Sequence, residues 1–104
     1  MRVLKFGGTS VGSVESITNV KKIVEAIDEP VVVVVSALGG ITDKLIETSR
    51  LAAAGDEKYS EEFNAMVERH RAMVEAVIPA GETRDALNVR LEALLGELRS
   101  IYHG

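Results

Sequence analysis

The chain has 104 residues, of which 46% are hydrophobic and 27% charged, and it carries a formal net charge of −4 with no cysteine. A chain of this length makes one domain or part of one, and the missing cysteine excludes disulfides, thiolate metal sites and thiol nucleophiles. The longest purely apolar run, Val31–Val35, is far too short to cross a bilayer, and no basic cluster is available for nucleic acid. We therefore expect no membrane or nucleic-acid partner, and a cytoplasmic location.

The first part of the chain has the pattern of a strand, a glycine loop and a helix. Residues 2–6 are mostly apolar and end at Gly7-Gly8, which predicts a short strand followed by a break. Residues 14–27 place apolar side chains three and four positions apart, the spacing of one helix face. Ser13 can cap this helix, because its hydroxyl can accept a hydrogen bond from a free main-chain N–H group.

The next part repeats the same order. Val31–Val35 shows no alternation, so we expect a parallel strand that is buried on both faces. Residues 36–40 break it with a second glycine pair. A second helix is predicted from about Thr42 to Ala54, with Gly55 as its left-handed C-cap. The order strand, helix, strand implies one right-handed crossover and therefore parallel strands.

From residue 56 onwards the pattern is wholly helical. Apolar and aromatic side chains form a stripe over residues 59–77, residues 79–81 interrupt it, and a leucine-rich stripe follows over residues 87–101. This arrangement predicts an αα-hairpin. His70 lies on the first stripe without a second ligand at helical spacing, so we interpret it as a packed or half-buried histidine and not as a metal ligand.

The predicted fold class is α/β, with two parallel strands, two βα units and then an αα-hairpin. Residues 1–55 would form the strand-and-loop part and residues 56–104 the hairpin. Two strands do not make a stable sheet by themselves, so we expect residues 1–104 to be the N-terminal portion of one longer domain. If the chain folds alone, we expect it to borrow strands from a second copy, as a homo-oligomer.

Both glycine pairs follow a predicted parallel strand and precede a helix, the place where open α/β sheets bind ligands. Glycine lets main-chain N–H groups approach a ligand, and the helix N-terminus behind each loop favours phosphate or carboxylate. Lys5 lies two residues before Gly7 and can place its ammonium on a phosphoryl group in transfer. Hydroxyl groups around the same loops belong to Thr9, Ser10, Ser36 and Thr42. The pattern predicts two adjacent anion sites, as a kinase with an anionic acceptor requires.

Each of these features also has a plainer interpretation. Lys5 can be a strand-end lysine with its head in water, the glycines can serve only as turns, and Thr42 can be the N-cap of the second helix. Residues 7–12 fit neither the dinucleotide fingerprint nor a Walker A loop. Two alternatives therefore stay open: a nucleotide- or anion-binding module without catalysis, and a helical interaction domain that docks through residues 56–102.

Two segments resemble the signatures of aspartate kinases. Residues 3–11, VLKFGGTSV, are similar to the N-terminal signature of that family, and residues 33–43, VVVSALGGITD, are similar to its second loop. The overall character resembles the kinase half of bifunctional aspartokinase–homoserine dehydrogenases. The resemblance implies the amino-acid kinase fold, an αβα sandwich around a mainly parallel sheet.

The resemblance also implies an activity, the ATP-dependent phosphorylation of the L-aspartate side-chain carboxylate to 4-phospho-L-aspartate. This reaction is the first step of lysine, threonine and methionine biosynthesis. Lys5 would be the catalytic residue that neutralises the transferring phosphate. The residues that would line the ATP phosphates are Lys5, Gly7, Gly8, Thr9 and Ser10. The residues that would line the meeting point of phosphate and aspartate are Ser36, Gly39, Gly40 and Thr42, the last of which would touch the aspartate.

Mg²⁺ would accompany ATP, with no residue of this chain assigned as its ligand. Members of the family carry further acceptor-binding and catalytic residues well downstream of these two signatures. We therefore expect the 104-residue chain to be inactive by itself.

Overall fold

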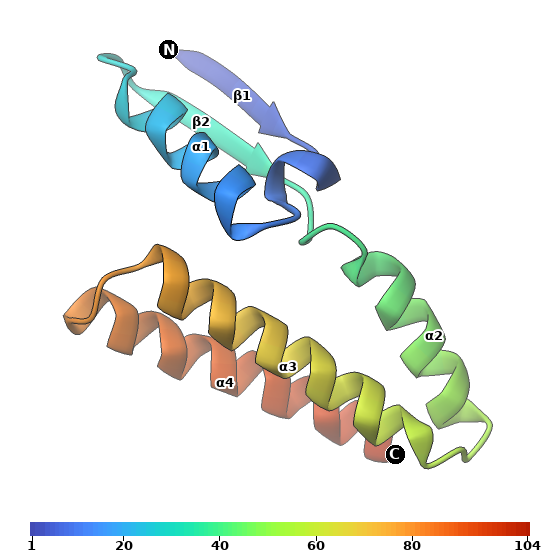
Figure 1. Cartoon of the computed structure of the whole chain (residues 1–104). Coiled ribbons are helices and arrows are strands. Elements are labelled where there is room, and N and C mark those ends of the chain that lie inside the picture. The colour runs from blue at the N-terminus through green and yellow to red at the C-terminus, as the bar shows by residue number, and fades with distance from the viewer. The chain divides into compact units, whose positions relative to one another are not determined.

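The computed structural model describes residues 1–104. The elements in chain order are β1 (Arg2–Phe6), the 3-10 helix η1 (Gly8–Val11), α1 (Val14–Glu25), β2 (Val31–Val35), α2 (Ile41–Ala53), α3 (Lys58–Val77) and α4 (Glu82–His103) (Figure 1). This order confirms the predicted α/β class, both strands and the helices that follow them. The chain divides into two compact units, residues 1–42 and residues 43–104. None of the helices combines the length and the apolar character that crossing a membrane requires.

The first unit is built on a two-stranded parallel sheet. Its register runs from Arg2 beside Val31 to Phe6 beside Val35. Parallel neighbours need a crossover connection, and α1 supplies it (Figure 1). The predicted crossover connection between two parallel strands is therefore confirmed.

Local side chains fix where α1 begins and which face of the sheet it lies against. The Ser16 N–H donates to the Ser13 hydroxyl oxygen at 3.1 Å, which confirms Ser13 as the N-cap. Phe6 of β1 lines a hollow together with Val20 and Ile23 of α1. The helix thus lies against the face of the sheet that carries Phe6, because alternate residues of a strand point to opposite faces.

The prediction that β2 is buried on both faces is wrong for this chain. Val32, Val33, Val34 and Val35 are exposed to 43%, 38%, 45% and 55%. The run of valines is typical of a central strand, but β2 has only β1 beside it, and α1 lies against one face alone. Burial of the β2 valines on both faces requires a second neighbouring strand and a helix on the other face, and residues 1–42 supply neither.

The two ends of α2 are set by glycines with left-handed backbone. Gly40 has φ 84° and α2 begins at Ile41, so Thr42 lies inside the first turn and its interpretation as the N-cap is wrong. The left-handed turn at Gly40 starts the helix one residue earlier than the pattern predicted. Gly55 has φ 71°, which confirms the left-handed C-cap.

In the second unit, α3 and α4 run side by side as the predicted hairpin (Figure 1). Its core holds Phe63, Met66 and Val67 of α3, each less than 5% exposed, and Tyr102 of α4. The Tyr102 and Phe63 rings meet edge to face, with centroids 6.0 Å apart. Aromatic pairs prefer this geometry, which adds to the stabilisation from apolar burial.

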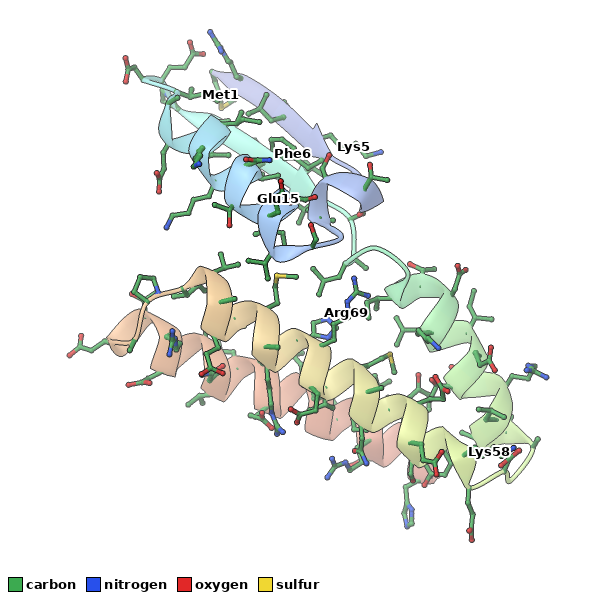
Figure 2. All side chains as sticks on the ribbon, viewed as in Figure 1. Met1, Lys5, Phe6, Glu15, Lys58 and Arg69 are labelled. Carbon is green, nitrogen blue, oxygen red and sulfur yellow. The ribbon has the colours of Figure 1, made fainter.

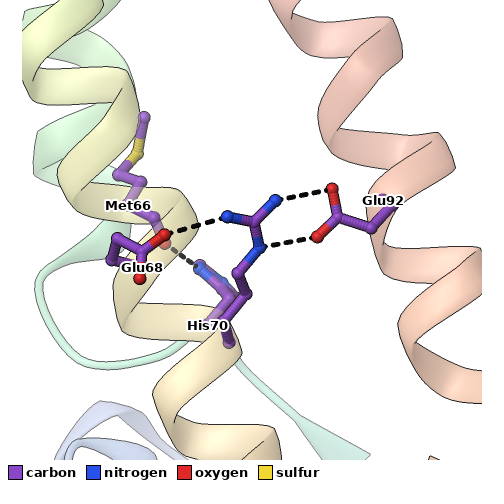
Figure 3. A network of polar contacts seen from close by, with 5 residues as sticks. Met66, Glu68, His70 and Glu92 are labelled. Atoms are coloured by element: carbon purple, nitrogen blue, oxygen red, sulfur yellow. Dashed lines mark hydrogen bonds and ion pairs between the residues drawn. The ribbon is translucent and has the colours of Figure 1, made fainter. Parts of the chain in front are cut away.

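Two further polar contacts belong to this unit. The fully buried Thr48 of α2 donates its hydroxyl to the Lys44 carbonyl oxygen at 2.7 Å. The Nδ1 atom of His70 lies 2.7 Å from the Met66 carbonyl oxygen, and the side chain is half-buried, as predicted (Figure 3).

Candidate phosphate-binding site

The candidate site lies where β1 and β2 end. Both strands are parallel, so their carboxyl ends meet at one edge of the sheet. At that edge β1 continues into residues 7–13, here called the first glycine loop. In the same place β2 continues into residues 36–40, here called the second glycine loop. The sequence prediction that the two glycine pairs share one edge is confirmed.

Main-chain hydrogen bonds connect the two loops. The Ser36 N–H donates to the Phe6 carbonyl oxygen at 3.1 Å, which extends the strand ladder into the second loop. Further along, the Gly39 N–H donates to the Val11 carbonyl oxygen at 3.4 Å. The loops are therefore fixed to each other and not only to their own strands.

The closest approach between the loops depends on Gly39. A Cβ atom at Gly39 would lie 2.9 Å from the Gly8 carbonyl oxygen and 3.1 Å from the Gly12 Cα atom. Both distances are shorter than ordinary packing of carbon against main-chain atoms allows. Glycine at this position is therefore required by contact between the loops, a stronger reason than turn formation alone.

The loops carry several main-chain N–H groups that donate no hydrogen bond within the chain. In the first loop these N–H groups belong to Gly7, Gly8 and Thr9. In the second loop they belong to Ala37, Leu38 and Gly40. Such groups suit the oxygens of phosphate or carboxylate, and the start of a helix adds partial positive charge. The edge of the sheet is thus a surface of hydrogen-bond donors.

Lys5 lies on β1 just before the first loop (Figure 2). Its side chain is exposed and makes no hydrogen bond or ion pair. In the register it stands beside Val34, and strand alternation places it on the face opposite Phe6. The ammonium is therefore available to an anion, with no carboxylate of the chain already neutralising it.

The structure brings some of the predicted hydroxyl groups together and leaves others apart. Thr9 and Ser10 line the hollow beside α1, on the side of the sheet that carries Phe6. The Ser36 hydroxyl donates to the Ala37 carbonyl oxygen at 2.9 Å. Thr42 is exposed in the first turn of α2. Lys5 does not share the hollow of Thr9 and Ser10, because it projects from the opposite face.

The donor set of this edge fits anions and not a metal ion. It consists of N–H groups, hydroxyls and one ammonium, whereas hard cations such as Mg²⁺ prefer carboxylate and carbonyl oxygens. No group of three or more His, Cys, Asp or Glu side chains in residues 1–104 could hold a metal ion. The edge can therefore bind the oxygens of a phosphate, with any metal held by the ligand.

A second charged group lies between α3 and α4 and was missed by sequence reasoning. The Arg71 guanidinium donates from Nε and Nη2 to the two carboxylate oxygens of Glu92 at 2.6 and 2.8 Å, and from Nη1 to Glu68 at 2.9 Å (Figure 3). Arg71 lowers the pKa of Glu92, chiefly through these hydrogen bonds. The spacing of Glu68 and Arg71 is a recognisable helix pair, but no local signal points to Glu92. This network ties two helices together and is remote in sequence from both glycine loops.

Comparison with known proteins gives a consistent result. The model of a family described as "Amino acid kinase family" matches residues 1–101. A bifunctional aspartokinase/homoserine dehydrogenase 1 of the chloroplast from Arabidopsis thaliana is 35% identical over 104 residues, which is 96% of this chain and 11% of the relative. An aspartokinase from Chlamydia muridarum is 38% identical over 98 residues, 93% of this chain and 20% of the relative.

A third relative, an aspartokinase from a Bacillus strain, is 49% identical over 61 residues, which is 54% of this chain and 14% of the relative. The chain therefore spans only about a tenth to a fifth of the length of these relatives.

Proposed function

The chain belongs to the amino acid kinase family, and from this premise we propose that it provides the phosphate-binding loops of an aspartate kinase. The proposed reaction moves the γ-phosphoryl group of ATP to a side-chain carboxylate oxygen of L-aspartate. The bond from phosphorus to the ADP oxygen breaks, a bond to the carboxylate oxygen forms, and the products are ADP and 4-phospho-L-aspartate. The relatives named aspartokinase support this substrate. We place the reaction at the first step of lysine, threonine and methionine biosynthesis.

The observation that carries the proposal is the contact between the two glycine loops at Gly39. Phosphoryl transfer needs two anionic groups held in line and close together, and most of the catalysis is positioning and neutralisation of charge. Two N–H-rich loops in van der Waals contact can hold a phosphate and a carboxylate next to each other. One isolated loop could hold only the nucleotide.

Each predicted residue has a role in this proposal. The N–H groups of the first glycine loop and the hydroxyls of Thr9 and Ser10 hold the ATP phosphates. The free ammonium of Lys5 neutralises the charge that develops on the transferring group. The second glycine loop, with Ser36 and the exposed Thr42, faces the acceptor carboxylate.

Magnesium is expected to arrive with ATP. When bound to the phosphates, it neutralises part of their charge. The residues of this chain hold the phosphate oxygens and leave the metal to other ligands. We propose that the enzyme works in the cytoplasm as a homo-oligomer.

A chimeric enzyme tests this function. The segment of the Chlamydia muridarum aspartokinase that matches this chain is replaced by residues 1–104, and acyl phosphate formed from ATP and L-aspartate is trapped with hydroxylamine. We expect transfer to L-aspartate above that to L-glutamate, the matched control acceptor. A folded chimera that binds ATP and transfers nothing to L-aspartate would contradict the proposal.

A second candidate is a nucleotide-binding module without catalysis. The observation that favours it is the position of Lys5 on the face opposite the hollow of Thr9 and Ser10. In such a module, Lys5 would contribute to binding and not to turnover. Replacing Lys5 in the chimera separates the two candidates, because only the kinase predicts a loss of turnover with ATP binding retained.

The isolated chain is expected to transfer no phosphate, because it spans about a fifth or less of the relatives named above. The check is the same hydroxylamine assay on the chain alone, with ATP and L-aspartate. ATP- and aspartate-dependent acyl phosphate above the level without protein would contradict this expectation.

A further inference from the structure

α4 carries an exposed apolar line on a face that does not pack the hairpin core. Leu87, Leu94 and Ile101 recur every seven residues, which is close to two helical turns, so they follow one side of the helix. Their side chains are exposed to 37%, 64% and 70%. The face turned to the core is marked instead by Tyr102, which is buried and meets the Phe63 ring of α3.

Two charged side chains lie on the same side of α4, and neither has a partner within the chain. Arg90 follows Leu87 by about one turn, and Glu97 follows Leu94 in the same way. Both are exposed and make no hydrogen bond or ion pair. Neither has an opposite charge three or four positions away, the spacing at which helix pairs form. We call the five residues Leu87, Arg90, Leu94, Glu97 and Ile101 the α4 stripe.

The α4 stripe is nearly symmetric about Leu94, with opposite charges on the two sides of it. When a second copy of the stripe runs in the opposite direction, Leu94 meets Leu94 and Leu87 meets Ile101. In the same arrangement Arg90 of each copy meets Glu97 of the other. A contact between identical copies about a two-fold axis requires a surface that is complementary to itself. Parallel copies would place each charge against its own kind, so charge selects the antiparallel direction.

A hollow beside Ile101 offers room for the Leu87 side chain of the other copy. It has a volume of about 300 Å³, and Ala52 and Ala53 of α2 line it together with Ile101 of α4. The short alanine side chains leave space that a leucine can fill. Filling it would remove apolar surface of both copies from water, which favours association.

We propose that the α4 stripe is a self-association surface on which a second copy of this chain binds antiparallel. A different protein would have to bring the same apolar spacing with the charges in reverse order, whereas this helix, when reversed, supplies both. Contact along about 21 Å of helix falls at the small end of protein interfaces, so the dimer is weak and forms only at high concentration. At the low concentrations of unfolding experiments the chain is monomeric. The inference is independent of the proposed reaction, because the stripe is remote in sequence from both glycine loops.

Charge reversal tests the surface, with sedimentation equilibrium of the 104-residue chain as the measurement. Arg90→Glu and Glu97→Arg should each weaken self-association by about tenfold or more, because two contacts between like charges replace two between opposite charges. An equal mixture of these two variants should form a mixed dimer, and the chain with both substitutions should regain the original affinity. Val89→Asp changes a 71% exposed valine on another side of α4, and it should leave the dimer unchanged.

Single cysteines report the direction of the two helices, because the chain has no cysteine of its own. Leu94→Cys should form a disulfide-linked dimer under mild oxidation, since a disulfide requires Cα atoms within about 7 Å. Leu87→Cys should not link to itself, because antiparallel helices place its two copies about 21 Å apart. It should link to Ile101→Cys when the two variants are mixed. Circular dichroism checks that each variant keeps its helix content.

Three outcomes would overturn the proposal. The first is a chain that remains monomeric at about 1 mM. The second is a dimer whose affinity neither charge reversal changes, which would place the contact elsewhere, for example on the exposed valines of β2. The third is Leu87→Cys linking to itself as readily as Leu94→Cys does, which would mean that the helices are parallel.

Discussion

At the scale of single residues, glycines with similar sequence surroundings are needed for different physical reasons. Gly39 is required because a Cβ atom there would lie too close to the main chain of the other loop, whereas a Cβ at Gly7 would meet nothing within 4 Å. Gly40 is required for its left-handed backbone. The sequence predicts glycine-rich breaks after both strands, but it does not reveal which glycine is a contact point, since that depends on how the loops pack.

Gly39→Ala tests the contact between the loops. The added methyl group forces the loops apart, and we expect residues 1–42 to lose about 1–3 kcal/mol of stability, as for other overpacked sites. Gly7→Ala is the control and should change stability by less than about 0.5 kcal/mol. Hydrogen exchange of the Ser36 amide, which donates to the Phe6 carbonyl oxygen where the two loops begin, measures the effect. Equal protection of this amide in the two variants would contradict the predicted contact between the loops.

At the scale of elements, the α3–α4 hairpin is held by a buried aromatic contact and by an exposed ion pair. Phe63 is 3% exposed and meets Tyr102, while Arg99 lies 5.2 Å above the Phe63 ring. The stripes in the sequence predict that the two helices pack. They do not predict which leucines turn outwards, and Leu94 is in fact 64% exposed.

Phe63→Ala removes the centre of the hairpin core. We expect the free energy of unfolding to fall by about 3–5 kcal/mol, the usual effect of truncating a buried aromatic side chain. Leu94→Ala should change stability by less than about 0.5 kcal/mol, because that side chain is mostly in water. Urea unfolding followed by circular dichroism compares the two variants. Similar losses in both would mean that the hairpin packs differently.

The ion pair between Arg71 and Glu92 predicts that the stability of the folded chain depends on pH, and in which direction. Arg71 lowers the pKa of Glu92 in the folded chain, so the pair contributes stability at pH values above the ordinary Glu pKa. That contribution is lost as the pH falls below about 4 and through the lowered pKa. Arg71→Ala should therefore lower the melting temperature slightly at pH 7 and not at strongly acidic pH. Arg90→Ala, an exposed arginine without an ion pair, should show no such dependence.

At the scale of the whole molecule, the two units differ in burial: residues 43–104 contain a buried aromatic core, whereas the sheet of residues 1–42 is largely exposed. In residues 43–104 the side chains of Phe63, Met66 and Tyr102 are buried, and the Phe63 and Tyr102 rings are in contact, whereas β1 and β2 leave most of their valines exposed. If the chain is a helical interaction domain, only the unit of residues 43–104 is needed for function. If it is part of a kinase domain, the sheet of β1 and β2 carries the function.

Deleting residues 1–6 distinguishes these views. Without β1 the valines of β2 have no partner strand, and we expect aggregation, since an unpaired apolar strand is a template for association. Residues 43–104 alone should stay helical and soluble. Light scattering measures the aggregation of each protein, and circular dichroism measures its helix content. A monomeric, fully folded chain without β1 would favour the helical interaction domain.

The fold could be predicted from sequence further than the site. Valine runs, helical spacing and caps such as Ser13 and Gly55 are local, and they placed both strands and the four α-helices to within a few residues, whereas the short 3-10 helix η1 in the first glycine loop was not predicted. The exposure of β2, the contact of Gly39 with Gly8 and the pairing of Arg71 with Glu92 depend on residues that are distant in sequence. No local pattern encodes such distances, so these features required coordinates.

The most direct measurement of the central claim is the turnover of the chimera with Lys5→Ala, beside Lys22→Ala as the control for loss of a lysine. Lys5 is free and precedes two loops in contact, so its loss should lower kcat for phosphate transfer to L-aspartate by about 10²–10³-fold. The Kd for ATP should change little, and Lys22→Ala should match the unmodified chimera. Equal turnover in both variants, or a loss confined to ATP binding, would contradict the role of this edge in phosphoryl transfer.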